Sequence, residues 1–142
     1  MARATRAETL TTASRRTEFH SDFLTSFAKT PVGNQLARVV NDKSINQSLK
    51  NLIMTNLGER LFQPFIGSNI YRTLFENNTT QTLHDLEFYV DNTIKNNEPR
   101  VNLVGVEAKT GSSENEIIIT IVYNTINNPE QITFEYILKR VR

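Results

Sequence analysis

Two short charged clusters carry the residue types and spacing that point most directly to chemistry. They are Gly58-Glu59-Arg60 and Glu98-Pro99-Arg100. In the second cluster, proline holds the chain in an extended path, and side chains two residues apart in an extended chain point to the same side. Glu98 and Arg100 would then present a carboxylate beside a guanidinium group, which can pair with a complementary Arg and Glu on another protein. This arrangement predicts a directional docking site.

The Glu98–Arg100 pair has a second interpretation, an internal salt bridge that holds the corner between a helix and a strand. An exposed ion pair contributes at most about 1 kcal/mol, so energy alone does not separate the two interpretations. The sequence leaves both open: the pair either binds a partner or braces its own chain.

The other reactive side chains form no convincing catalytic or metal-binding set. Cysteine is absent, and histidine occurs only at His20 and His84, far apart in the sequence, so thiol chemistry and a histidine-built metal centre are not expected. The glycines form no phosphate-binding loop, and the sequence has no GxSxG motif. His84 beside Asp85 is a candidate general base, but a solvent-facing or interfacial histidine is far commoner in the middle of a helix. We therefore expect no catalytic residue, no metal and no cofactor.

Carboxylates offer one alternative enzyme class. A glycosidase needs two carboxyl groups separated by about 5 to 9 Å, and the candidates here are Glu59, Glu76, Asp85, Glu87 and Glu98. Any protein of this size contains such pairs, and this chain has no tryptophan to stack on a sugar. Solvated surface carboxylates are the preferred interpretation, and a peptidoglycan hydrolase is kept as the alternative function.

Length, composition and charge narrow the class of protein. A chain of 142 residues with 38% hydrophobic side chains is long enough for one domain with a real core. No apolar run approaches the roughly 20 residues that span a membrane, and no apolar stretch follows the first basic residues as in a secretory signal peptide. The formal net charge of +1 gives no general attraction to nucleic acid or anionic membranes. We expect a protein partner rather than a membrane or nucleic acid.

Residues 1–18 are predicted to form a flexible, mildly basic tail ahead of a single domain at 19–142. The tail has hardly any large apolar side chain, so it cannot offset the entropy of its own ordering. It either stays a solvated terminus, the commoner case, or settles on an acidic partner surface through Arg3, Arg6, Arg15 and Arg16. A nucleic-acid adaptor that uses this tail is a third functional hypothesis.

Hydrophobic periodicity predicts an α+β fold, a single compact domain with helices packed on a small, mainly antiparallel sheet. A short strand at 35–40 precedes a helix at 42–55, a short helix after Ser68 and a helix from Thr79 or Thr80 to Asn96. From residue 101 the period changes from 3.6 to 2, which predicts strands near 101–109, 117–123 and 132–138. The middle strand is apolar on both faces and is expected to be central and covered on both sides.

Three phenylalanines precede these elements at a helical spacing. Phe19, Phe23 and Phe27 recur every four residues and would align on one face of a helix, although Thr25 and Pro31 favour a short or irregular element. We expect the three rings to fill the core.

Four segments follow one another in a specific order along the chain: the run from Ile45 to Arg60, Phe65-Ile66-Gly67, Leu74-Phe75-Glu76 and Glu98-Pro99-Arg100-Val101. This series resembles the small baseplate wedge subunit of T-even-type contractile-tailed phages, a family related to the type VI secretion baseplate component. The resemblance covers about Asp22 to Arg142, and Leu57 stands where the family commonly has proline.

The resemblance implies a structural, non-enzymatic role and a fold related to the polymerising domain of the contractile sheath subunit. It places the chain in the tail baseplate of a virion that is assembled in the bacterial host cytoplasm. The expected partners are the core helical bundle of larger wedge proteins and the sheath subunit, with tail tube or hub proteins as further candidates. By position, Glu98, Pro99 and Arg100 match the signature that contacts the core bundle. Gly58, Glu59 and Arg60 match a second motif, also expected to bind a partner, and the late strands are expected to extend a sheet with sheath strands.

Overall fold

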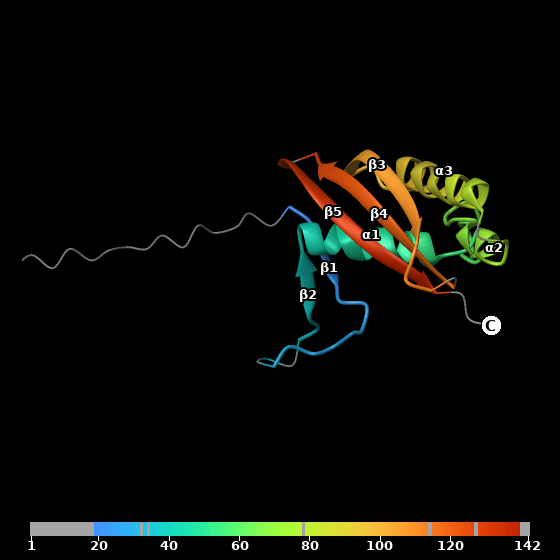
Figure 1. Cartoon of the computed structure of the whole chain (residues 1–142). Coiled ribbons are helices and arrows are strands. Elements are labelled where there is room, and N and C mark those ends of the chain that lie inside the picture. The colour runs from blue at the N-terminus through green and yellow to red at the C-terminus, as the bar shows by residue number, and fades with distance from the viewer. Residues whose placement is uncertain are drawn as a thin grey trace, which may run out of the picture.

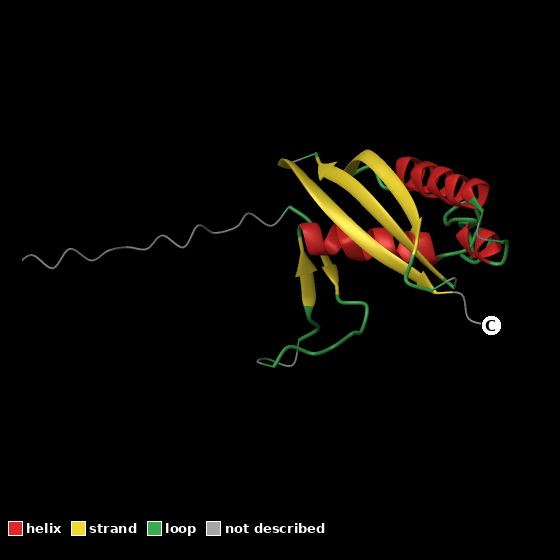
Figure 2. Ribbon diagram, in the orientation of Figure 1, coloured by secondary structure: helices red, strands yellow, loops and turns green. Residues whose placement is uncertain are grey.

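The computed structural model of this protein describes residues 19–31, 33, 35–77, 79–113, 115–126 and 128–139. The predicted tail at 1–18 lies outside the described residues. The main body consists of three helices and an antiparallel sheet, and a smaller hairpin projects from it (Figures 1 and 2). The predicted α+β fold is confirmed.

The main sheet is a meander of three long strands. They are β3 (Val101–Thr110), β4 (Glu116–Thr125) and β5 (Asn128–Lys139), in the order β3-β4-β5. All neighbours pair antiparallel, with Ala108 opposite Ile119 and Ile119 opposite Tyr136. The three strands and the central position of β4 agree with the period-2 pattern of the sequence.

The helices cover the sheet with the apolar stripes that their sequences predict. They are α1 (Asp42–Met54), the single-turn α2 (Ile70–Leu74) and α3 (Thr80–Asn97), and α3 lies alongside β3 (Figure 1). The predicted positions Ile45 and Leu49 of α1 and Leu86 and Val90 of α3 are fully buried. The side chain of Thr79 accepts a hydrogen bond from the Thr82 amide, as expected of an N-cap. Among the described residues, no helix combines the length and apolarity needed to span a membrane.

The central strand is buried on one face and half-buried on the other. Ile117, Ile119, Ile121 and Tyr123 form the core face, while Ile118 and the alternate positions after it are of intermediate exposure. Full coverage on both sides was therefore a wrong expectation, because the helices form a single layer on one face of the sheet. Tyr123 also ties β4 to α1: burial raises its pKa to about 12, and its hydroxyl donates to Asn46 Oδ1 at 2.7 Å.

The predicted core role of Phe19, Phe23 and Phe27 is wrong. Their residues are 58%, 53% and 68% exposed, and the chain here forms β1 (Ser21–Phe23), which pairs antiparallel with β2 (Arg38–Val40) in a separate two-stranded sheet. The Gln47 side chain of α1 holds this path extended, since its amide donates to Phe23 O at 2.7 Å and its oxygen accepts from Thr25 N at 3.1 Å. None of the three residues lies in a helix: Phe23 ends β1, and Phe19 and Phe27 lie just outside it. The segment projects from the main body (Figure 2), so the three rings do not share a helical face turned to the core.

We expect Ile119→Ala to lower the free energy of unfolding by about 3 kcal/mol, because a fully buried side chain in the central strand leaves a cavity. The matched control is Ile137→Ala on β5, which is 51% exposed and should cost less than about 1 kcal/mol. Urea unfolding followed by circular dichroism measures both. Equal losses would place the core elsewhere than on the inner face of β4.

Candidate functional site

The Glu98–Arg100 cluster lies at the corner between α3 and β3. The Glu98 amide donates to Ile94 O at 2.9 Å and so closes the last turn of α3. Arg100 binds the Glu98 carboxylate with two hydrogen bonds, from Nε to Oε1 at 2.6 Å and from Nη2 to Oε2 at 2.7 Å. Ser48 of α1 donates its hydroxyl to the same Oε2 at 2.6 Å. One carboxylate therefore joins α1, α3 and the start of β3.

Glu98 is ionised in this arrangement. Burial alone would raise the pKa of its carboxyl, but the hydrogen bonds from Arg100 and Ser48 and the charge of Arg100 outweigh burial and lower the pKa below its ordinary value near 4.5. The hydrogen bonds to Glu98 raise the pKa of Arg100, and the charge of Asp22 on β1 acts in the same direction. The pair is a bidentate, charge-assisted interaction.

Of the two interpretations of this pair, the internal brace is the one that the described chain adopts. Glu98 is only 4% exposed, whereas the Arg100 side chain is 36% exposed. The expectation that both charges are displayed outward is wrong, because Pro99 lies in a tight turn rather than in an extended segment, and the Val101 amide donates back to Glu98 O at 3.3 Å. Of the two charged groups, Arg100 alone reaches the surface.

The Gly58-Glu59-Arg60 cluster occupies a loop between α1 and α2, and no hydrogen bond or ion pair among the described residues joins it to the Glu98 corner. Gly58 has a positive φ of 84° and donates its amide to Pro64 O at 2.8 Å. The carboxylate of Glu59 accepts from the Asn56 amide at 2.9 Å. Arg60 is exposed and has no ion pair among the described residues. Gly58 and Glu59 shape the loop, and Arg60 is its outward charge.

Sequence reasoning missed the apolar side chains of this same loop. Leu61 is 86% exposed, Phe62 is 99% exposed and Phe65 is 89% exposed. Their signal was a cluster of large apolar residues between Gly58 and Gly67 that fits neither a helical nor a strand period. Such a cluster outside any periodic element has no core face to join, and this is the property that sets it apart from the predicted stripes.

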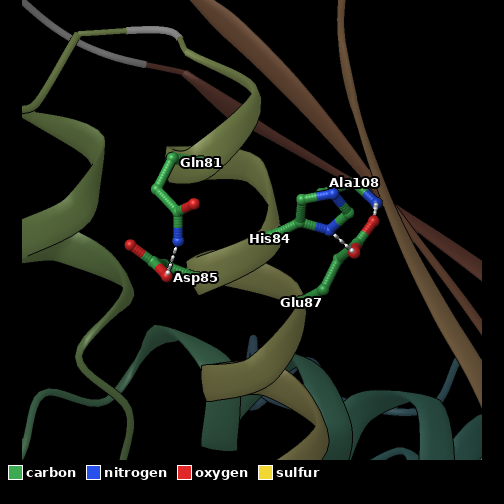
Figure 3. A network of polar contacts seen from close by, with 5 residues as sticks. All are labelled: Gln81, His84, Asp85, Glu87 and Ala108. Atoms are coloured by element: carbon green, nitrogen blue, oxygen red, sulfur yellow. Dashed lines mark hydrogen bonds and ion pairs between the residues drawn. The ribbon is translucent and has the colours of Figure 1, made fainter.

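His84 belongs to a contact that covers a sheet edge (Figure 3). Its Nδ1 lies 3.0 Å from Glu87 Oε2, while Glu87 Oε1 accepts the backbone amide of Ala108 on β3 at 2.9 Å. Asp85, the expected partner of a catalytic His84, is instead hydrogen-bonded to Gln81 at 3.0 Å. His84 and Asp85 thus do not form a catalytic base with an orienting acid. Glu87 instead accepts a hydrogen bond from an amide on the outer edge of β3.

A cavity of about 280 Å³ lies beside this contact, lined by His84, Glu87, Phe88, Asp91 and Val106. Its carboxylates are engaged, Glu87 with Ala108 and Asp91 with Lys95 at 2.8 Å. Within the described ranges, no three His, Asp or Glu side chains are grouped so that they could hold a metal ion.

A family comparison decides the class of this chain. The model described as "Baseplate wedge protein gp25" matches residues 39–130, which include both charged clusters. The chain belongs to this baseplate wedge family. A curated relative, baseplate wedge protein gp25 of Enterobacteria phage T4, is 31% identical over 97 residues, covering 68% of this chain and 74% of the relative. The resemblance read from the motifs is confirmed.

Solved structures share the fold. A protein from Geobacter sulfurreducens, provisionally described as a tail lysozyme, matches with a TM-score of 0.65 and 25% identity over 71% of this chain and 92% of its own. A chain of the anti-feeding prophage baseplate matches with a TM-score of 0.60 and 19% identity over 83% of each chain. A chain of the type VI secretion system baseplate complex has a TM-score of 0.55 and 15% identity over 69% of this chain and 93% of its own. The last two establish likeness of fold.

The lowered pKa of Glu98 predicts an acid-sensitive fold. Because the folded carboxyl releases its proton more readily than the unfolded one, the contribution of Glu98 to stability is complete above about pH 5 and is lost as the pH falls through its lowered pKa. We expect Glu98→Gln to flatten this acid-side slope in thermal melts recorded between about pH 2 and pH 7.

Glu107 provides the matched control for this measurement. It pairs with Lys109 at 2.7 Å with the same two-residue spacing, but both side chains are exposed. Glu107→Gln should change the slope less, and its effect should vanish at high salt because solvent and ions screen exposed pairs. Equal, salt-sensitive effects at both sites would contradict the buried state of Glu98.

Proposed function

We propose that this chain is a non-enzymatic structural subunit of a contractile-tail baseplate wedge, which docks on larger wedge proteins and helps to initiate the sheath. Membership of the baseplate wedge family supports the structural role. The proposed location is the tail baseplate of a virion assembled in the host cytoplasm. We assign the wedge domain to residues 19–142, preceded by the basic segment at residues 1–18.

Docking on a larger wedge protein uses Arg100 as the contacting group. The observation that carries this proposal is the partly exposed Arg100 side chain, whose guanidinium group the buried Glu98 carboxylate holds through two hydrogen bonds. A preoriented guanidinium loses little further side-chain entropy when a partner binds it. Pro99 sets the turn and Glu98 is a positioning residue. Gly58 and Glu59 shape the second contacting loop, from which Arg60 reaches a partner carboxylate.

Sheath initiation uses an open strand edge, by addition of a sheath strand to the sheet. Of the two outer strands, β3 lies beside α3 and has its Ala108 amide occupied by Glu87. β5 has β4 as its one strand neighbour among the described residues, so its outer edge is available along Asn128–Lys139. The β1–β2 hairpin is a second small sheet with exposed side chains. We assign the first sheath strand to β5.

A peptidoglycan hydrolase is the alternative function, favoured by the provisional description of the Geobacter sulfurreducens protein. Glycoside hydrolysis needs one carboxyl group that holds a proton at working pH. Glu98 has a lowered pKa and three hydrogen bonds to its carboxylate, which suits an ion-pair anchor and not a proton donor. Glu59 is committed to the Asn56 amide. These contacts support the structural role over the hydrolytic one.

Docking through Arg100 is tested with a neutral pair, Glu98→Gln together with Arg100→Gln. Reversing the charge at Arg100 alone would place a second carboxylate against buried Glu98 and disrupt the corner, whereas the double variant leaves no buried unpaired charge. We expect affinity for the co-expressed larger wedge proteins to fall at least tenfold, about 1.4 kcal/mol, with circular dichroism unchanged. The control is Glu107→Gln with Lys109→Gln, an exposed pair of the same spacing. If both double variants bound the larger wedge proteins equally well, Arg100 would not be part of the interface.

Strand addition is tested by amide hydrogen exchange with the purified sheath subunit. We expect the outer-edge amides of β5 to gain protection on binding, since they acquire a strand partner. The amide of Ala108 on β3 is already bonded to Glu87 and should change little. If sheath binding protected the amides of β3 and left those of β5 unchanged, the assignment of the sheath strand to β5 would be wrong.

A further inference from the structure

We propose that the loop at residues 56–68, here called the aromatic loop, inserts Leu61, Phe62 and Phe65 into an apolar groove with an acidic rim on a larger wedge protein. This inference rests on the proposed docking function and gives it a second, separate contact. In this proposal the apolar side chains of the loop make the main contacts with the groove. Arg60 recognises a carboxylate at the edge of the groove.

The exposure of the aromatic loop is the first observation. Phe62 and Phe65 are 99% and 89% exposed, and Leu61 is 86% exposed. A buried aromatic side chain removes roughly 150 to 250 Å² from water, so Phe62 and Phe65 together leave about 300 to 500 Å² of mainly apolar side-chain surface exposed in one loop. A patch of that size on a monomer is commonly an interaction site, whereas single exposed apolar residues are ordinary.

The aromatic loop is held in shape by its own backbone. The Ser68 amide donates to Thr55 O at 2.8 Å and joins the two ends of the loop. The Gly58 amide donates to Pro64 O at 2.8 Å and joins two points within it. Gly67 has a φ of 135°, and a Cβ at this position would lie 2.6 Å from Thr55 O, which only glycine avoids. An ordered loop that presents aromatic side chains loses little entropy on binding.

Phe62 adds a local strain that the free protein does not use. Its φ of 67° lies in the left-handed region, which bulky residues rarely adopt and which accumulates at binding sites. The same backbone path would be relaxed with glycine. A bulky aromatic residue at this position, with almost all of its surface in solvent, gives no folding benefit, and its place in the chain is explained by contact with another molecule.

The charge of the aromatic loop indicates which class of partner binds it. Glu59 is bound to the Asn56 amide, while Arg60 has no ion pair among the described residues, so the outward charge of the loop is positive and its partner bears a carboxylate. A second copy of this chain, packed about a two-fold axis through the loop, would bring two Arg60 side chains together. A lipid surface calls for several cations beside the apolar groups, and Arg60 is a single one. A protein groove with an acidic rim fits best.

Phe62→Gly provides a sharp test, because it removes the aromatic ring and also relaxes the backbone at φ 67°. We expect the thermal midpoint to stay equal or rise, while affinity for the co-expressed larger wedge proteins falls at least tenfold. The matched control is Phe88→Ala on α3. It removes an aromatic ring from a residue that is 65% exposed and should leave the affinity unchanged. Arg60→Gln should weaken binding less than Phe62→Gly and reduce its salt dependence.

A photo-crosslinking phenylalanine analogue at position 62 identifies the occupant. In the assembled wedge we expect crosslinks to apolar residues next to an Asp or Glu of a larger wedge protein, and none from the same analogue at position 88. Crosslinks to a second copy of this chain, or retention by vesicles containing anionic lipid, would overturn the proposal, as would full affinity in Phe62→Gly. The loop variants keep the Glu98 corner intact. Their binding therefore tests the aromatic loop separately from the Glu98→Gln, Arg100→Gln double variant, which tests the Arg100 contact.

Discussion

The buried Glu98 carboxylate is the interaction on which the rest of this structure depends. A carboxylate with 4% exposure is costly unless its oxygens are paired, and here Arg100 and Ser48 supply that pairing. Because these groups come from α1, from the end of α3 and from the start of β3, the carboxylate sets how the helical layer meets the sheet. The same contact fixes the position of the partly exposed Arg100 side chain, so the fold and the proposed docking contact share one ion pair.

Two segments outside the helices and the main sheet carry exposed apolar side chains. The β1–β2 hairpin exposes Phe19, Phe23 and Phe27, and the aromatic loop exposes Phe62 and its neighbours. A two-stranded sheet is marginal by itself, and here Gln47 of α1 holds it through the backbone of Phe23 and Thr25. Both segments are therefore held by hydrogen bonds while their apolar side chains stay exposed, which is the combination expected of a protein that completes its packing against a partner.

The two outer strands of the main sheet differ in how their outer edges are covered among the described residues. α3 lies along β3, and Glu87 occupies the Ala108 amide (Figure 3). β5 has no such cover among the described residues. In the proposed strand addition, β5 is therefore the edge at which a further strand can pair, because α3 packs beside β3 and Glu87 occupies one of its outer amides.

The sequence by itself determined the family, the α+β class, the helical stripes of α1 and α3 and the order of three late strands, because these follow from local periodicity and from motifs in a fixed order. It left the Glu98–Arg100 pair undecided, since burial of a carboxylate depends on Ser48, fifty residues away in the chain. It misassigned Phe19, Phe23 and Phe27, because a spacing of four residues carries no information about whether a core lies within reach. Tertiary structure alone decided that the Phe62 ring is in solvent and that Glu87 covers β3, since both depend on which segments the fold brings together.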